Sequence, residues 1–167
     1  MNGLTRDNLV EAYQKRFSES QMKEIIKGLD DSLDVSIYAK ECYNNRQMEQ
    51  LRIGLIENLD VSSYADPTLN SAHMMVILRG LRRRIDMSLY IKQGFSAAQM
   101  NEILDGLLLG VDVSAYADTH YSPDQMDQIC TGLIDDLDVS RYADPSLTVD
   151  EMQQIRIALI EEAEKAS

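Results

Sequence analysis

The acidic residues of this sequence gather in two clusters, so calcium binding is the first chemistry to consider. The clusters are Asp30, Asp31 and Asp34, and Asp135, Asp136 and Asp138. An EF-hand loop needs alternating oxygen ligands, a glycine near its middle and a closing glutamate. Neither cluster has this pattern. We therefore interpret the aspartates as helix caps and solvated surface residues, and we predict no metal site.

Two other sets of residues could take part in chemistry: the histidines and cysteines, which can bind zinc, and the serines, which can act as nucleophiles. The two histidines and two cysteines, His73, His120, Cys42 and Cys130, lie far apart in the chain, unlike the close pairs of a zinc site. One serine recurs in five copies of a motif, at Ser36, Ser62, Ser88, Ser114 and Ser140. A reaction needs one nucleophile, and no nucleotide-binding or hydrolase motif is present. The sequence thus predicts a protein that is not an enzyme and holds no cofactor.

A period of 26 residues organises the chain. Methionines recur with this spacing at Met22, Met48, Met74, Met100, Met126 and Met152. A glycine recurs at Gly28, Gly54, Gly80, Gly106 and Gly132, with Ala158 in the sixth place. A fixed period of about 20 to 50 residues is typical of repeat arrays, in which each repeat buries its apolar face against its neighbours.

Each repeat begins with a signal for a helix N-terminus. An apolar residue is followed by Ser, Asn or Thr, as in Phe17-Ser18, and a Gln or Glu stands three residues further on in five of the six repeats. This is the capping-box pattern, with a hydrophobic staple between Phe17 and Met22. The pattern predicts a long amphipathic helix in every repeat.

The second part of each repeat predicts a turn and a very short helix. The long helix is expected to end at the place of Ser32, Asn58, Arg84, Gly110 and Asp136, where a left-handed residue can form a C-terminal cap. The motif LDVSxYA follows, with Asp34 and its equivalents as N-caps and with Val35 and Tyr38 facing inward. Glycine inside a helix costs about 1 kcal/mol relative to alanine. Its recurrence at Gly28 therefore predicts close approach of a backbone or of the tyrosine.

These signals predict an all-α fold, an α-solenoid of six 26-residue repeats with atypical terminal caps. Residues 1–16 form the N-terminal capping helix, with Thr5 as its N-cap. Residues 17–167 form a single domain. Its repeats are 17–42, 43–68, 69–94, 95–120, 121–146 and 147–167.

The consensus of the repeat, QMxxIxxGLxxxLDVSxYADP, resembles a tandem repeat of uncharacterised bacterial proteins, some of them encoded on mobile elements. The resemblance extends from Phe17 onward. It implies a helical repeat fold and a bacterial origin, and it implies no activity.

The formal net charge of −12 is unevenly distributed. Repeat three, residues 69–94, has five basic residues and one acidic residue. Repeat five, residues 121–146, has one basic residue and six acidic residues. The sequence has no membrane-spanning segment and no signal peptide, so we expect a cytoplasmic protein. We predict a non-enzymatic protein–protein interaction scaffold of unknown partner, with self-association between repeats three and five as one possibility. The alternative is nucleic-acid binding through repeat three, which the acidic flanks disfavour.

The predicted contact surface follows from the residues that vary between repeats on the exposed side of the long helix. Positions three and four apart on a helix share a face, and neighbouring repeats align these faces. The predicted partner-binding residues are Ile53, Ile56, Arg79, Arg82 and Arg83.

Overall fold

The computed structural model of the chain describes residues 6–166, so the proposed N-cap Thr5 lies outside the described residues. The described part is all-helical and contains no strand. It forms two compact units, which meet in sequence between Arg84 and Ile85. We call residues 6–84 the N-terminal unit and residues 85–166 the C-terminal unit.

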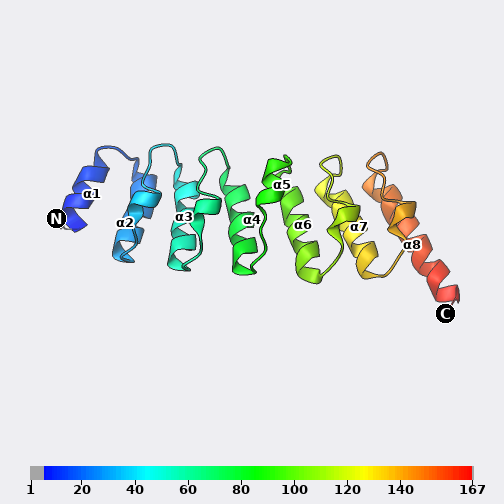
Figure 1. Cartoon of the computed structure of the whole chain (residues 1–167). Helices are drawn as coiled ribbons and strands as arrows, with labels where there is room; N and C mark the ends of the chain where they lie inside the picture. Colours follow the sequence, from blue (N-terminus) through cyan, green and yellow to red (C-terminus); the bar gives the residue numbers. More distant parts are fainter. Residues whose placement is uncertain (1–5, 167) are drawn as a thin grey trace. The chain divides into compact units, whose positions relative to one another are not determined.

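The N-terminal unit contains the capping helix and three long helices with two short 3₁₀ helices between them. Its elements are α1 (Arg6–Gln14), α2 (Glu19–Asp30), η1 (Val35–Ile37), α3 (Asn45–Ile56), η2 (Val61–Ser63) and α4 (Ser71–Arg82). Each α-helix packs on the next, and α2, α3 and α4 stand side by side and run in the same direction (Figure 1).

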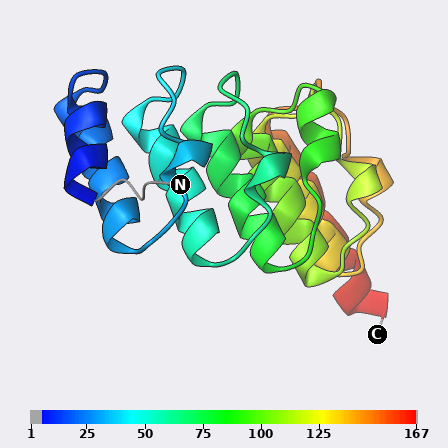
Figure 2. The same ribbon diagram turned by 60° about the vertical axis from the view of Figure 1, so that its left-hand side comes forward.

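The C-terminal unit has the same alternation of long and short helices. Its elements are α5 (Ser88–Lys92), α6 (Ala97–Leu109), η3 (Val113–Ala115), α7 (Pro123–Ile134), η4 (Val139–Arg141) and α8 (Val149–Ala166). Helix α7 packs against both α6 and α8. Figure 2 shows the ribbon from another direction, in which the segments that connect one long helix to the next can be followed.

The predicted capping boxes are confirmed at five of the six long helices. Reciprocal bonds between the N-cap and the third helical residue begin α2, α3, α6 and α7, and Thr148 and Glu151 form the same pair at α8. At α4 only Asn70 accepts a bond, from the backbone of His73. These pairs satisfy backbone N–H groups that would otherwise lack partners.

The predicted helix ends are also confirmed. Ser32, Asn58, Arg84, Gly110 and Asp136 all have positive φ angles, between 54° and 77°. Next to Ser32, the N–H of Leu33 donates to the carbonyl of Gly28 at 2.8 Å, and the same bond follows α3, α6 and α7. This is a Schellman cap, which turns the chain away from the helix and satisfies its last carbonyls.

The short second helix is a single 3₁₀ turn in four places and a five-residue α-helix in one. Asp34, Asp60, Asp112 and Asp138 cap the 3₁₀ turns, as expected. Asp86 makes the same capping bond, since its side chain accepts from the N–H of Ser88 at 2.8 Å, although α5 begins one residue later and its N-cap position is Met87. The sequence departs here from DVSxYADP to DMSLYIKQG.

The close approach predicted at the repeated glycine is confirmed in both units. A Cβ at Gly28, Gly54, Gly106 or Gly132 would overlap the hydroxyl of the tyrosine ten residues later. That hydroxyl donates to a backbone carbonyl of the long helix, for example from Tyr38 to Glu24 at 3.0 Å. The missing side chain therefore makes room for the tyrosine that fastens the short helix to the long one.

No helix within residues 6–166 combines the length and apolar character needed to cross a membrane.

Candidate interaction surface

The exposed edge of each long helix is formed by residues three or four apart, as predicted. On α2 these are Lys23, Lys27 and Asp30, all exposed. On α3 and α4 of the same unit, the equivalent places are Glu49, Ile53 and Ile56, and Met75, Arg79 and Arg82. Since α3 packs beside α4, these edges lie next to one another.

All five predicted contact residues lie on or directly after α3 and α4 of the N-terminal unit. Ile56 is 44% exposed, and Arg82 and Arg83 are exposed, whereas Ile53 and Arg79 are half-buried. Arg83 is the C-cap residue of α4. An accessible surface thus exists here, but its outer part is formed by Ile56, Arg82 and Arg83, with the other two residues beneath.

Two further residues shape this surface. Met75, one turn before Arg79, is 55% exposed and extends the apolar area. Glu57 accepts two hydrogen bonds from the Arg82 guanidinium, both 2.6 Å long. This pair lowers the pKa of Glu57, raises that of Arg82 and neutralises part of the basic charge. We call the set Ile53, Ile56, Met75, Arg79, Arg82 and Arg83 the basic–apolar face.

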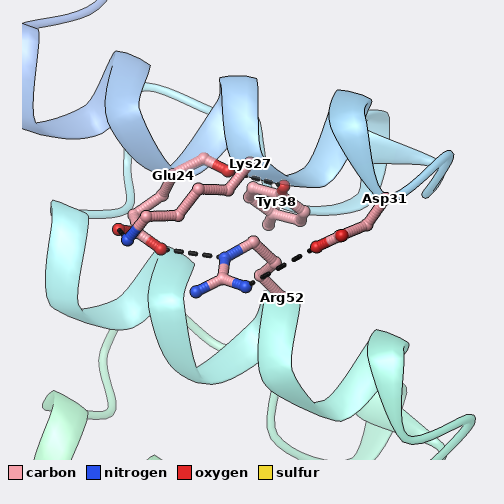
Figure 3. Close-up of polar contacts among 5 residues, drawn as sticks. All are labelled: Glu24, Lys27, Asp31, Tyr38 and Arg52. Atoms are coloured by element: carbon pink, nitrogen blue, oxygen red, sulfur yellow. Dashed lines mark hydrogen bonds and ion pairs between the residues drawn. The ribbon is translucent and has the colours of Figure 1, made fainter.

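A second polar cluster in the N-terminal unit joins α2 to α3, and its central pair, Glu24 and Arg52, is largely buried (Figure 3). Glu24, only 7% exposed, accepts bonds from Arg52 at 2.9 Å and from Lys27 at 2.6 Å. The Arg52 guanidinium also approaches Asp31, at 3.9 Å. Burial alone would raise the pKa of Glu24, yet Lys27 and Arg52 together hold it below its usual value. Because its charges are satisfied internally, this cluster fixes how two helices pack rather than binding a ligand.

The capping-box glutamines have a further function that sequence analysis did not detect. The side-chain amide of Gln47 donates to the carbonyls of Pro67 and Leu69 in the next loop, at 3.1 and 2.6 Å. Gln99 and Gln125 make the same pair of bonds in the C-terminal unit. One side chain thus starts a helix and holds the following loop, which explains why these glutamines are buried.

A groove of about 520 Å³ lies along these loops in the N-terminal unit. Among its lining residues, Gln21 and Gln47 are already bonded to backbone carbonyls, and Glu41 is held by Arg16 at 2.9 Å. Cys42 also lines the groove. The groove is open and polar, and its polar side chains serve the loops rather than converging on a common point.

Three of the five recurring serines bond the aspartate that caps the short helix. The hydroxyl and N–H of Ser36 both donate to Asp34, and Ser62 and Ser140 do the same with Asp60 and Asp138. Cys42 is exposed, Cys130 is buried, and both are free thiols. Within residues 6–166 no group of three metal-ligating side chains comes together.

Comparison with known proteins gives no relative: no family model, no curated protein and no solved structure matches the chain.

Proposed function

We propose that the protein is a non-enzymatic scaffold for protein–protein interaction, built as an α-solenoid of six 26-residue repeats. The observation that carries the proposal is the basic–apolar face. There, exposed Ile56 and Met75 lie on neighbouring helices together with Arg82 and Arg83. Exposed apolar side chains beside arginines are typical of protein contact sites. The free thiols fit a reducing compartment such as a cytoplasm.

In this scaffold the repeated residues and the variable residues have different roles. Recurring residues, such as Met48, which has an equivalent in all six repeats, and Tyr64, which has one in five, are buried and build the array. Residues of the exposed edges differ from repeat to repeat, so they can distinguish one partner from another.

Replacing Ile56 and Arg83 by serine tests this surface. Both side chains are exposed, so the changes should leave the packing of the helices intact. We expect the double variant to lose partners that the wild-type chain captures from the native host, with a melting temperature within a few degrees of wild type. The matched control is Lys40→Ser with Thr68→Ser, two exposed loop positions away from the face. Equal capture by the wild-type chain and the Ile56 and Arg83 variant would contradict the proposal.

Nucleic-acid binding is the second candidate, since four arginines, Arg79 and Arg82 to Arg84, lie at the end of α4 and directly after it. Phosphate binding needs available cations, and Glu57 already neutralises Arg82. We expect no complex with single- or double-stranded DNA or RNA at physiological salt, measured by fluorescence anisotropy. A complex tighter than about micromolar that weakens steeply with salt would favour this candidate instead.

A further inference from the structure

The net charge of −12 is confined to one half of the chain. Residues 1–84 contain twelve Lys and Arg against twelve Asp and Glu, whereas residues 85–167 contain four against sixteen. Three of these four cations form ion pairs inside the C-terminal unit. The pairs join Arg141 to Glu162, Arg156 to Asp135 and Lys165 to Glu161. Most carboxylates of this unit therefore have no opposite charge to balance them.

The C-terminal unit exposes apolar side chains at the same repeat positions that form the basic–apolar face. Leu109 at the end of α6 is 65% exposed, and Ile134 at the end of α7 is 51% exposed. Leu109 lies 26 residues after Arg83, one full repeat later. Leu108 and Ile157 are exposed as well. Such side chains on adjoining helices form more apolar surface than scattered single residues would.

The charged residues next to these apolar side chains are mostly acidic. Asp135 directly follows α7, Glu161 lies one turn after Ile157 on α8, and Asp127 is exposed on α7. Asp135 and Glu161 each take part in one of the ion pairs given above, with Arg156 and Lys165. We call Leu108, Leu109, Ile134, Asp135, Ile157 and Glu161 the acidic–apolar face. Its surroundings are strongly negative: burial, together with the neighbouring Asp127 and Asp105, raises the pKa of Glu102 on α6.

We propose that the acidic–apolar face of one chain binds the basic–apolar face of a second copy of the same chain. The two faces occupy equivalent repeat positions, both present exposed aliphatic side chains, and their charges are of opposite sign. The proposal rests on the proposed function, because one half of the contact is the surface described above.

Charge determines which faces can meet. Two acidic–apolar faces repel each other, as do two basic–apolar faces, so the favourable contact joins unlike faces. A contact between two different patches of identical chains is heterologous, and it produces either a closed oligomer or open chains. The exposed leucines and isoleucines supply burial of apolar surface, and the charges supply orientation and a dependence on salt.

The test uses two serine variants of the full-length chain, each with one disabled face. The first is Ile56→Ser with Arg83→Ser, and the second is Leu109→Ser with Ile134→Ser. All four side chains are exposed, so both variants should keep the helix content and melting temperature of the wild type. The control is Leu89→Ser with Lys92→Ser, two exposed residues of α5 outside both faces.

Sedimentation velocity of each protein over a range of concentrations gives the readout. We expect the wild type and the control to associate, and each variant alone to be monomeric. An equimolar mixture of the two variants should form a dimer, because one variant retains the acidic–apolar face and the other retains the basic–apolar face. Raising the salt from about 0.05 M to about 0.5 M should weaken every one of these complexes.

Three results would overturn the inference. They are a wild type that stays monomeric at high concentration, a variant that still associates alone, and a mixture that does not form the dimer. Monomeric wild type would leave the proposed function intact if the Ile56 and Arg83 variant still loses a captured partner. In that case the occupant of the basic–apolar face is a different protein.

Discussion

At Gly54 the space that a side chain would need is already filled by Tyr64. A Cβ there would overlap the tyrosine hydroxyl and would approach Val61 Cγ1 to 2.7 Å. The same arrangement surrounds Gly28, Gly106 and Gly132. Ala158 takes this place in the last repeat, where no DVSxYA segment follows and the residue is exposed. The glycine is thus retained where a tyrosine must be accommodated.

The first prediction concerns Gly54→Ala. In an open helix position this change would stabilise the protein by about 1 kcal/mol. Here we expect a loss of about 1 to 3 kcal/mol, because the tyrosine must move. Chemical denaturation with circular dichroism gives the value.

Tyr64→Phe provides the control for this prediction. The change removes the hydroxyl that donates to the Gln50 carbonyl at 3.1 Å, at a cost of about 1 kcal/mol. Combined with Gly54→Ala, it should cost less than the sum of the two single changes, because the overlapping atom is gone. Strict additivity would show that the methyl group and the hydroxyl do not compete for space.

The second prediction concerns the left-handed residue that ends α2. Ser32 has a φ of 58°, a conformation that costs a residue with a side chain about 1 kcal/mol. We expect Ser32→Gly to raise the free energy of unfolding by about 0.5 to 1 kcal/mol and Ser32→Val to lower it. Thermal melts of the three proteins would contradict this if glycine and valine shifted the midpoint in the same direction.

At the scale of the elements, the buried pair of Glu24 and Arg52 determines how α2 and α3 pack. Removing one member of a buried ion pair leaves an unbalanced charge, which costs about 3 to 5 kcal/mol. Replacing both members with groups of similar size is often nearly neutral. The chain itself contains such a replacement, since Gln50 and Leu78 stand one repeat later at the same two places.

The third prediction follows from that comparison. Arg52→Leu alone should destabilise the N-terminal unit, because Glu24 then keeps only the exposed Lys27 as its partner, whereas Glu24→Gln with Arg52→Leu should recover most of the loss. Because the pKa of Glu24 is lowered, its stabilising effect is present above about pH 4.5 and is lost as the pH falls below that value. The deficit of the single variant should therefore shrink in acid, as measured by urea denaturation at several pH values. An unchanged deficit would show that the pair contributes through packing rather than charge.

Local signals allowed much of the fold to be predicted. The capping box at Ser18, the left-handed stop at Ser32 and the cap at Asp34 each involve residues close in sequence, and all three are confirmed. Contacts between repeats were not predicted, because they depend on the offset between neighbouring helices. The bonds from Gln47 to the loop at Leu69 and from Arg82 to Glu57 are of this kind.

The candidate site was predicted less completely, because the burial and the ion pairs of its residues also depend on contacts between repeats. The spacing of Ile56 and Arg82 placed them correctly on an exposed edge, but spacing cannot show that Ile53 and Arg79 are half-buried. It also cannot show that a carboxylate from the preceding repeat neutralises Arg82. A search for opposite charges about one repeat apart would have found Glu57, which lies 25 residues before Arg82.

At the scale of the whole molecule, the same buried tyrosine secures the short helices of both units. Tyr38, Tyr64, Tyr116 and Tyr142 are fully buried, and each donates its hydroxyl to a backbone carbonyl fourteen residues earlier. Burial raises the pKa of all four, and that of Tyr142 reaches about 12. A tyrosinate can neither donate this bond nor remain buried without a large cost.

The last prediction is that the chain unfolds cooperatively in alkali. An unfolded tyrosine has a pKa of about 10, below the value in the fold. The stability contributed by each tyrosine is therefore complete below about pH 10 and is lost as the pH rises toward the folded pKa. Tyrosinate absorbance from the buried residues should appear together with the loss of helical circular dichroism.

The variant Tyr142→Phe provides the control. It should be about 1 kcal/mol less stable than the wild type at neutral pH, because its hydrogen bond is gone. Between neutral pH and about pH 11, however, it should lose less stability than the wild type does. If all the tyrosines ionised near pH 10 while the helices stayed intact, the hydroxyls would be open to solvent. Their hydrogen bonds would then not be what holds the short helices against the long ones.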